Sequence, residues 1–135
     1  MMTFHLQIVT VDGLRFEGEV EAVSVRAVTG NLTLLARHMD FVTALGMGSA
    51  FVTIDGQKRY AACIGGMLAM TKGQARLIAT TFEWAEDIDV ERAKAALSRA
   101  QARLERPESS AEEKKLATAA MQRATVRLNV AEAYR

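Results

Sequence analysis

The sequence has little cysteine and proline, and its glycine is confined to the first part of the chain. Among its 135 residues there is one cysteine, Cys63, and one proline, Pro107. A lone cysteine excludes an internal disulfide framework and suits a reducing compartment. Two histidines and one cysteine, scattered along the chain, are a poor ligand set for zinc, so we expect no metal site.

Long apolar runs and a dominant charge are also missing. No run approaches the eighteen or so apolar residues of a membrane-spanning helix, and residues 1–5 lack the basic-then-apolar order of a signal peptide. We therefore expect no direct membrane insertion. The formal net charge is +1 and half of the residues are hydrophobic, which argues against disorder and against general nucleic-acid binding.

Turn residues divide the chain into two regions. All nine glycines lie at or before Gly73, and Pro107 stands alone in the remainder. This change in composition predicts a boundary near residues 82–88, with one domain over 1–84 and a second over 85–135.

The first region has the pattern of short β-strands. Phe4, Leu6 and Ile8 alternate with polar residues, and an apolar run over 51–54 leads into the hairpin turn Asp55-Gly56. Further short runs recur between turn signals to residue 81. We expect an antiparallel β-sandwich or flattened barrel, followed by helices, in an α+β fold.

The second region is rich in alanine and arginine and predicts a helical hairpin. Asp87 or Asp89 is placed to cap the first helix. Its apolar face would contain Ala93, Leu97, Ala100 and Leu104.

The second helix has two possible starts. Ser109 with Glu112 and Ser110 with Glu113 both fit a capping box. The predicted apolar series is Leu116, Ala120 and Val130, continuing to Tyr134. Because buried alanines remove little apolar area from water, we expect the hairpin to be marginally stable and open to redistribution by a ligand.

Several segments, in order, resemble one protein family. Residues 18–45 read GEVEAVSVRAVTGNLTLLARHMDFVTAL, followed by IGGM at 64–67, IDVERA at 88–93 and RLNVA at 127–131. Their order and spacing resemble the epsilon subunit of bacterial F-type ATP synthases over nearly the whole chain.

The resemblance implies a rotor protein without an active site or a required cofactor. Such subunits bind the gamma subunit and the c-ring at the cytoplasmic face of the plasma membrane and help to couple proton or sodium flow to ATP synthesis. Their helices can extend toward the alpha and beta subunits and inhibit ATP hydrolysis. The resemblance places rotor contacts at Asn31 and His38.

Three positions depart from the family pattern. Arg26, Ala36 and Asp40 stand where the family usually has proline, so backbone dihedrals that proline would fix are free here. Asn31 occupies a position that is often glutamate. We expect the rotor-facing loops to differ in shape or affinity from those of relatives.

The IDVERA segment resembles a motif through which some epsilon subunits bind ATP without hydrolysing it. Four positions match: Ile88, Asp89, Arg92 and Ala93. By the same resemblance Glu83, Arg99, Arg123 and Arg127 are further candidates. ATP is expected as a regulatory ligand that favours the folded hairpin, because guanidinium groups bind phosphate well; a need for magnesium is left open.

Plainer interpretations compete with these. Arginines on a two-helix unit are usually a solvated face, and Asp89 is an ordinary first-turn acid. His38 and Cys63 sit in no local catalytic motif, so a hydrolase is disfavoured. The alternative function is a free-standing ATP sensor or a helical adaptor.

Overall fold

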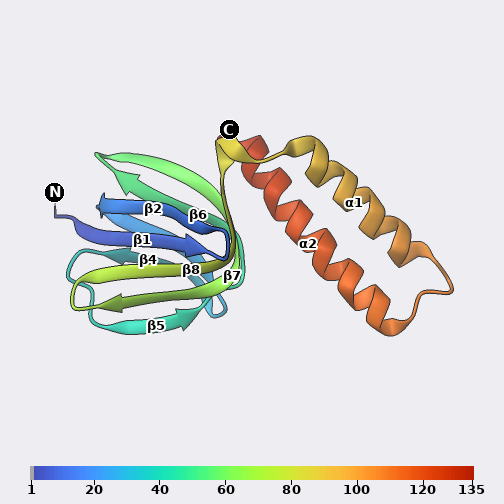
Figure 1. Cartoon of the computed structure of the whole chain (residues 1–135), viewed down its shortest axis with the longest axis horizontal. Helices are drawn as coiled ribbons and strands as arrows, with labels where there is room; N and C mark the ends of the chain where they lie inside the picture. The colour runs from blue at the N-terminus through green and yellow to red at the C-terminus, as the bar shows by residue number, and fades with distance from the viewer. Residues whose placement is uncertain (1) are drawn as a thin grey trace. The chain divides into compact units, whose positions relative to one another are not determined.

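The computed structural model describes residues 2–135, which divide into two compact units, one ending at Trp84 and one spanning Ala85–Arg135. The first unit is built from eight strands and the second from helices (Figure 1). The strands are β1 (Phe4–Thr10), β2 (Gly13–Val20), β3 (Ala22–Ala27), β4 (Gly30–Leu35), β5 (Phe41–Ala44), β6 (Met47–Ile54), β7 (Gln57–Thr71) and β8 (Gln74–Trp84).

The strands form one sheet in the order β2-β1-β8-β7-β6-β3-β4, with β5 paired to β7. The sheet is not closed, since β2 and β4 lie at its two ends. Every pairing between strands is antiparallel except that of β1 with β8, which is parallel. The predicted antiparallel fold is confirmed with this one exception. Two parallel strands need a long connection between them, and here the six strands from β2 to β7 lie between β1 and β8 in the chain.

The longest strand, β7, turns at Gly65 and Gly66, which have φ angles of 68° and 113°. Its first part pairs with β6 and its last part with β5, so the strand serves both parts of the sheet. A Cβ atom on Gly66 would lie 2.0 Å from the carbonyl oxygen of Ile78 on β8. The turn therefore requires glycine for both its backbone conformation and its contact with β8.

The core of the first unit lies between inward-facing side chains of these strands. On β1, Phe4, Leu6 and Ile8 are buried while the residues between them are partly exposed. A charged side chain is also buried here: Glu21 accepts a hydrogen bond from the backbone N–H of Gly56 at 2.7 Å. This bond ties the β2–β3 corner to the β6–β7 turn.

We expect Gly66→Ala to destabilise the protein far more than Gly73→Ala. Both glycines have positive φ, but nothing lies within 4 Å of a Cβ at Gly73. The control should therefore lose only the stability that a left-handed backbone costs a residue with a Cβ atom, about 1–3 kcal/mol. Gly66→Ala adds a clash with β8 worth about 1–3 kcal/mol or more. Urea unfolding measures both; equal losses would contradict the steric account.

An ion-pair cluster joins the first two strands at the sheet edge. The Nε2 atom of His5 lies 2.8 Å from Glu17 Oε2, and its Nδ1 atom lies 3.3 Å from Glu19 Oε2. The hydrogen bond to Glu17 is the largest cause that raises the pKa of His5 above its ordinary value of 6.5. The exposed cluster thus holds a proton on His5 most firmly when both glutamates are present.

Because the folded pKa of His5 is raised, its contribution to stability is complete below pH 6.5 and disappears as the pH rises through the folded pKa. We expect an NMR titration to give His5 a pKa above 6.5 in the wild type and a lower pKa in Glu17→Gln. Glu112→Gln, a change on the second helix, is the control and should leave the His5 pKa where it is. An unchanged His5 pKa in Glu17→Gln would show that the ion pair does not form.

The second unit contains a 3-10 turn, η1 (Ala85–Asp87), and two helices, α1 (Val90–Glu105) and α2 (Ala111–Tyr134). Figure 1 shows α1 and α2 side by side, joined by a short loop, which confirms the helical hairpin. Asp89 caps α1 and Ser110 caps α2, so each pair of alternatives is resolved. Ser109 instead donates its hydroxyl to the Arg103 carbonyl at 2.9 Å, at the end of α1.

Alanines at intervals of seven residues form the buried faces of the two helices. They are Ala93 and Ala100 on α1, and Ala117, Ala124 and Ala131 on α2. Small side chains at this spacing let antiparallel helices approach closely. The predicted series on α2 was partly wrong: Val130 is buried, but Leu116 is 62% exposed and Tyr134 is 45% exposed. Alanines make up most of the buried face of α2, and Leu116, which directly precedes Ala117, lies outside that face.

Candidate nucleotide and rotor-contact sites

The first four candidate ATP ligands lie at the start of α1. Asp89 is the helix cap, and its Oδ1 atom accepts a hydrogen bond from the Arg92 backbone N–H at 3.0 Å. Ile88 is buried, and its carbonyl oxygen accepts a hydrogen bond from Arg135 Nη1 at 3.1 Å. Ala93 is also buried. Three of the four motif residues therefore have structural roles within the hairpin.

The side chain of Arg92 extends from the same turn and is exposed. Arg99 follows seven residues later and is also exposed, while Arg123 on α2 is half-buried. Each of these arginines immediately precedes a buried alanine, so in an antiparallel pair all three flank the contact face on the same side. Across residues 2–135, none of their side chains forms a hydrogen bond or an ion pair. Three guanidinium groups are thus available on one side of the hairpin, as phosphate binding requires.

The two remaining candidates are Arg127 and Glu83. Arg127 is one turn beyond Arg123, is half-buried, and already interacts with other residues. Glu83 belongs to β8 in the first unit, where it pairs in register with Ala62. Arg106 continues the seven-residue spacing of Arg92 and Arg99 in the sequence, but it is the C-cap of α1 and its backbone is extended. The helical spacing therefore does not place it on the same face.

The two candidate rotor contacts lie at opposite ends of β4. Asn31 is exposed near the start of the strand, and its Oδ1 atom accepts a hydrogen bond from Arg26 Nη1 at 3.4 Å. Arg26 also lies against Gly48, where an added Cβ would come within 2.8 Å of the Arg26 Cβ. Arg26, which stands where the family usually has proline, thus packs against the neighbouring strand β6.

His38 follows the end of β4 and is half-buried. Its Nδ1 atom lies 2.9 Å from the Met39 carbonyl oxygen, and its ring centroid lies 5.2 Å from that of Phe41. Four residue steps, or about 13 Å of extended strand, separate Asn31 from Leu35, whose carbonyl oxygen accepts a hydrogen bond from the His38 backbone N–H. The two candidate contacts therefore lie near opposite ends of this strand.

The loop that contains His38 is tied to the β7–β8 turn. Asp40 Oδ1 accepts a hydrogen bond from the Lys72 backbone N–H at 2.9 Å, and Ala36 packs against the core. Both residues occupy usual proline positions. The hydrogen bond between Asp40 and the Lys72 backbone restrains this loop, as the fixed φ angle of a proline would do at the same position.

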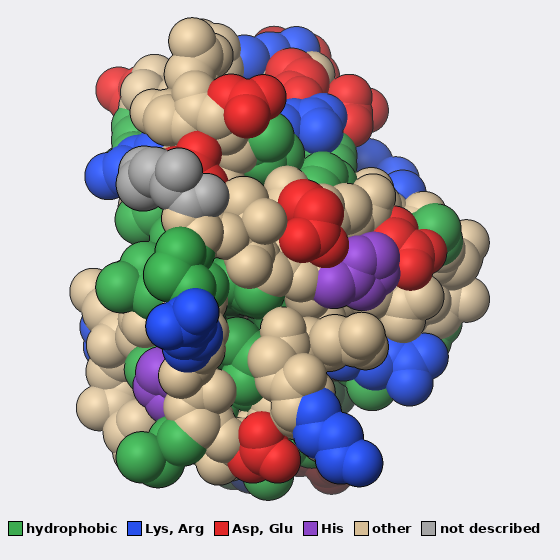
Figure 2. Space-filling view, turned by 90° about the vertical axis from the view of Figure 1, so that its left-hand side faces the viewer, with side chains coloured by type: hydrophobic (Ala, Val, Ile, Leu, Met, Phe, Trp, Pro, Cys, Tyr) green, Lys and Arg blue, Asp and Glu red, His purple; other side chains and the backbone are tan. Residues whose placement is uncertain are grey.

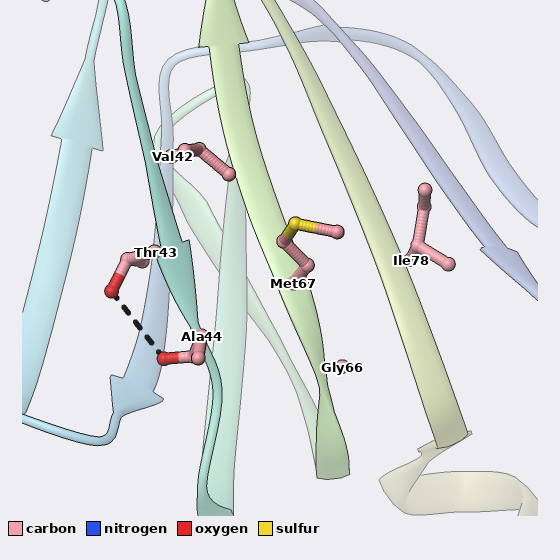
Figure 3. A pocket seen from close by; sticks show the side chains of 6 residues that line it. All are labelled: Val42, Thr43, Ala44, Gly66, Met67 and Ile78. Carbon is pink, nitrogen blue, oxygen red and sulfur yellow. Dashed lines mark hydrogen bonds between the residues drawn. The ribbon is translucent and has the colours of Figure 1, made fainter.

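A feature that sequence reasoning missed is an open apolar hollow on the first unit, with a volume of about 480 Å³. Figure 3 shows its lining on β5, β7 and β8, namely Val42, Thr43, Ala44, Gly66, Met67 and Ile78. The side chains of Val42, Met67 and Ile78 are 60%, 44% and 43% exposed. The available signal in the sequence was the apolar residues at outward-facing positions of these strands. An exposed apolar patch of this kind is typical of a protein interface.

The geometry also bears on catalysis and on metals. Cys63 is buried, and desolvation raises the pKa of its thiol to about 12, so it stays protonated and unreactive at neutral pH. Among residues 2–135, no three His, Cys, Asp or Glu side chains are grouped to hold a metal ion. Neither α1 nor α2 combines the length and apolar character of a membrane-spanning helix.

Comparison with known proteins identifies the family. The model of the ATP synthase delta/epsilon chain beta-sandwich domain matches residues 3–85, and that of the long alpha-helix domain matches residues 86–132. The ATP synthase epsilon chain of Halalkalibacterium halodurans is 37% identical over 131 residues, covering 97% of this chain and 98% of the relative. That of Bacillus velezensis is 40% identical with the same coverage.

Solved structures share the fold. A chain of the Euglena gracilis mitochondrial ATP synthase (OSCP, F1 and c-ring) aligns with a TM-score of 0.81 at 22% identity, covering 96% of this chain and 81% of the other. A chain of the Tetrahymena thermophila mitochondrial ATP synthase central stalk and c-ring aligns with a TM-score of 0.64 at 8% identity, covering 94% and 95%. The chain belongs to the ATP synthase delta/epsilon chain family. Its bacterial relatives are named ATP synthase epsilon chains, which confirms the resemblance found in the sequence.

Proposed function

We propose that this chain is the epsilon subunit of the central stalk of an F-type ATP synthase, where it helps to couple proton or sodium flow to ATP synthesis. The observation that carries the proposal is the match of both units, in order, to epsilon chains over 97% of the chain. In this role it is a non-catalytic subunit, bound peripherally at the cytoplasmic face of the plasma membrane through its partners.

The first unit supplies the docking surfaces in this proposal. The apolar hollow at Val42, Met67 and Ile78 suits the gamma subunit, because burial of exposed apolar side chains drives protein association. The polar ends of β4, at Asn31 and His38, suit the c-ring. Acidic and basic side chains are interspersed on the face of the molecule shown in Figure 2, as expected for a protein surface rather than a nucleic-acid site.

The second unit supplies regulation. Its helices meet through alanines, each of which buries little apolar area, so a partner or ligand needs little free energy to change their arrangement. We propose that the helices inhibit ATP hydrolysis when they extend toward the alpha and beta subunits. ATP held by Arg92, Arg99 and Arg123 would join α1 to α2 and favour the folded hairpin.

Isothermal titration with ATP, with and without magnesium, tests the nucleotide site. We expect Arg92→Ala and Arg99→Ala each to weaken binding about tenfold or more, since a hydrogen bond to a charged group is worth about 1.5–3 kcal/mol. Arg103→Ala is the matched control on α1 and should change affinity less than about twofold. Equal losses in all three variants would point to general charge attraction and against a defined site.

Asp89 needs a separate comparison, because it caps α1. Asp89→Asn keeps a good cap, whereas Asp89→Ala loses about 1 kcal/mol of helix stability. If the carboxylate itself binds ATP, both variants should weaken binding. If only Asp89→Ala does so, the residue acts through the helix and is not a ligand.

Co-elution with the gamma subunit tests the rotor assignment. We expect Met67→Asp to abolish co-elution, because a charge in the apolar hollow would be buried without a partner. Leu116→Asp, at an exposed position on α2, should retain it. ATP binding by a wild-type chain that has no affinity for gamma would favour a free-standing sensor instead.

A further inference from the structure

The motif residue Ile88 can meet a nucleotide only through its backbone carbonyl oxygen. Its N–H group donates to the Ala85 carbonyl oxygen at 3.4 Å, and its side chain is buried. The Ile88 carbonyl oxygen is not used by α1, because the Arg92 N–H donates to the Asp89 side chain instead. This oxygen is therefore the atom of Ile88 that a ligand would use.

The Ile88 carbonyl oxygen is covered by Arg135. The Arg135 Nη1 atom donates a hydrogen bond to it at 3.1 Å. With this contact in place, Ile88 is 1% exposed, backbone included. Arg135 itself is exposed, and its side chain forms no other hydrogen bond or ion pair with any residue from 2 to 135. A ligand can thus reach the Ile88 oxygen only by displacing the Arg135 guanidinium.

The chemistry of a carbonyl oxygen selects the part of ATP that would bind to it. Phosphate oxygens are acceptors, so they cannot hydrogen-bond to another acceptor. Arg92 and Arg99, two of the proposed phosphate ligands, follow Ile88 by four and eleven residues, or about 6 Å and 16 Å along α1. Phosphates on these arginines leave the opposite end of the nucleotide, the base, for Ile88. The donor at that end is the amino group of adenine.

We propose that Arg135 competes with the nucleobase for the Ile88 carbonyl oxygen and so sets the base selectivity of the nucleotide site. The guanidinium keeps the adenine amino group from this oxygen, yet it can donate to the 6-oxo group of a base such as hypoxanthine. A vacant Ile88 oxygen has the reverse preference, since it accepts from adenine and repels an oxo group. The inference rests on the proposed function, which assigns ATP to the two helices.

The competition has a distinctive sign. Removal of a cation ordinarily weakens the binding of an anion such as ATP. Here Arg135→Ala leaves the Ile88 oxygen permanently vacant, and a ligand binds more tightly when its binding-competent state is always populated. If the oxygen is vacant about a tenth of the time in the wild type, ATP gains about tenfold in affinity. Inosine triphosphate, which lacks the amino group, gains nothing and loses the guanidinium as a donor.

Isothermal titration of the full chain with ATP and with inosine triphosphate tests the proposal. We expect the ratio of the two affinities to rise about tenfold or more in favour of ATP in Arg135→Ala. Arg135→Met, which keeps the long stem without the donors, should give the same rise. Arg103→Ala removes the same charge from α1 and is the control, with a change in the ratio of less than about twofold. Any loss of hairpin stability affects both nucleotides alike and cancels in the ratio.

An unchanged ratio in Arg135→Ala would overturn the inference. Equal strengthening of both nucleotides would also overturn it, because the ribose hydroxyls, which the two ligands share, would then be the groups that use the oxygen. If neither the wild type nor Arg135→Ala binds either nucleotide, the proposed nucleotide site fails and this inference fails with it. Wild-type ATP binding that depends on Arg92, together with an unchanged ratio, would defeat the inference alone.

Discussion

The first unit depends on the close contact between β7 and β8 at Gly66. At this point β7 changes from pairing with β6 to pairing with β5, and its backbone lies directly against that of β8. Without this turn, β5 could not join the sheet beside Met67. The apolar hollow lined by Ala44, Met67 and Ile78 needs that arrangement. A backbone constraint thus determines where the exposed apolar side chains of this hollow stand.

The second unit is held by weaker means. Most buried residues of its helices are alanines, and at each helix start the Asp89 or Ser110 side chain accepts a hydrogen bond from a backbone N–H group. The two units therefore differ in kind: one has a core of large side chains, and the other has a seam of small ones. This contrast agrees with the proposed division of labour, in which the first unit docks and the second responds to ligands and partners.

Local features were the ones that could be predicted from the sequence. Turn residues, alternating apolar residues and capping side chains gave the strands, the hairpin and the caps, because each depends on neighbours in the chain. The parallel pairing of β1 with β8 could not be predicted, since it joins residues far apart. The outward position of Leu116 depends on which face of α2 meets α1. Likewise, Asp87 and Asp89 both fitted the cap of α1 in the sequence, and the backbone geometry was needed to choose Asp89.

The bond from Arg135 to the Ile88 carbonyl closes the second unit into a ring. It joins two positions 47 residues apart, one just before α1 and one at the end of α2. Any movement that separates the base of the hairpin must break this bond, whereas bending at the α1–α2 loop can leave it intact. The hydrogen bond of the Arg135 guanidinium therefore distinguishes two kinds of opening. It breaks when the start of α1 separates from the end of α2, and it persists when only the α1–α2 loop bends.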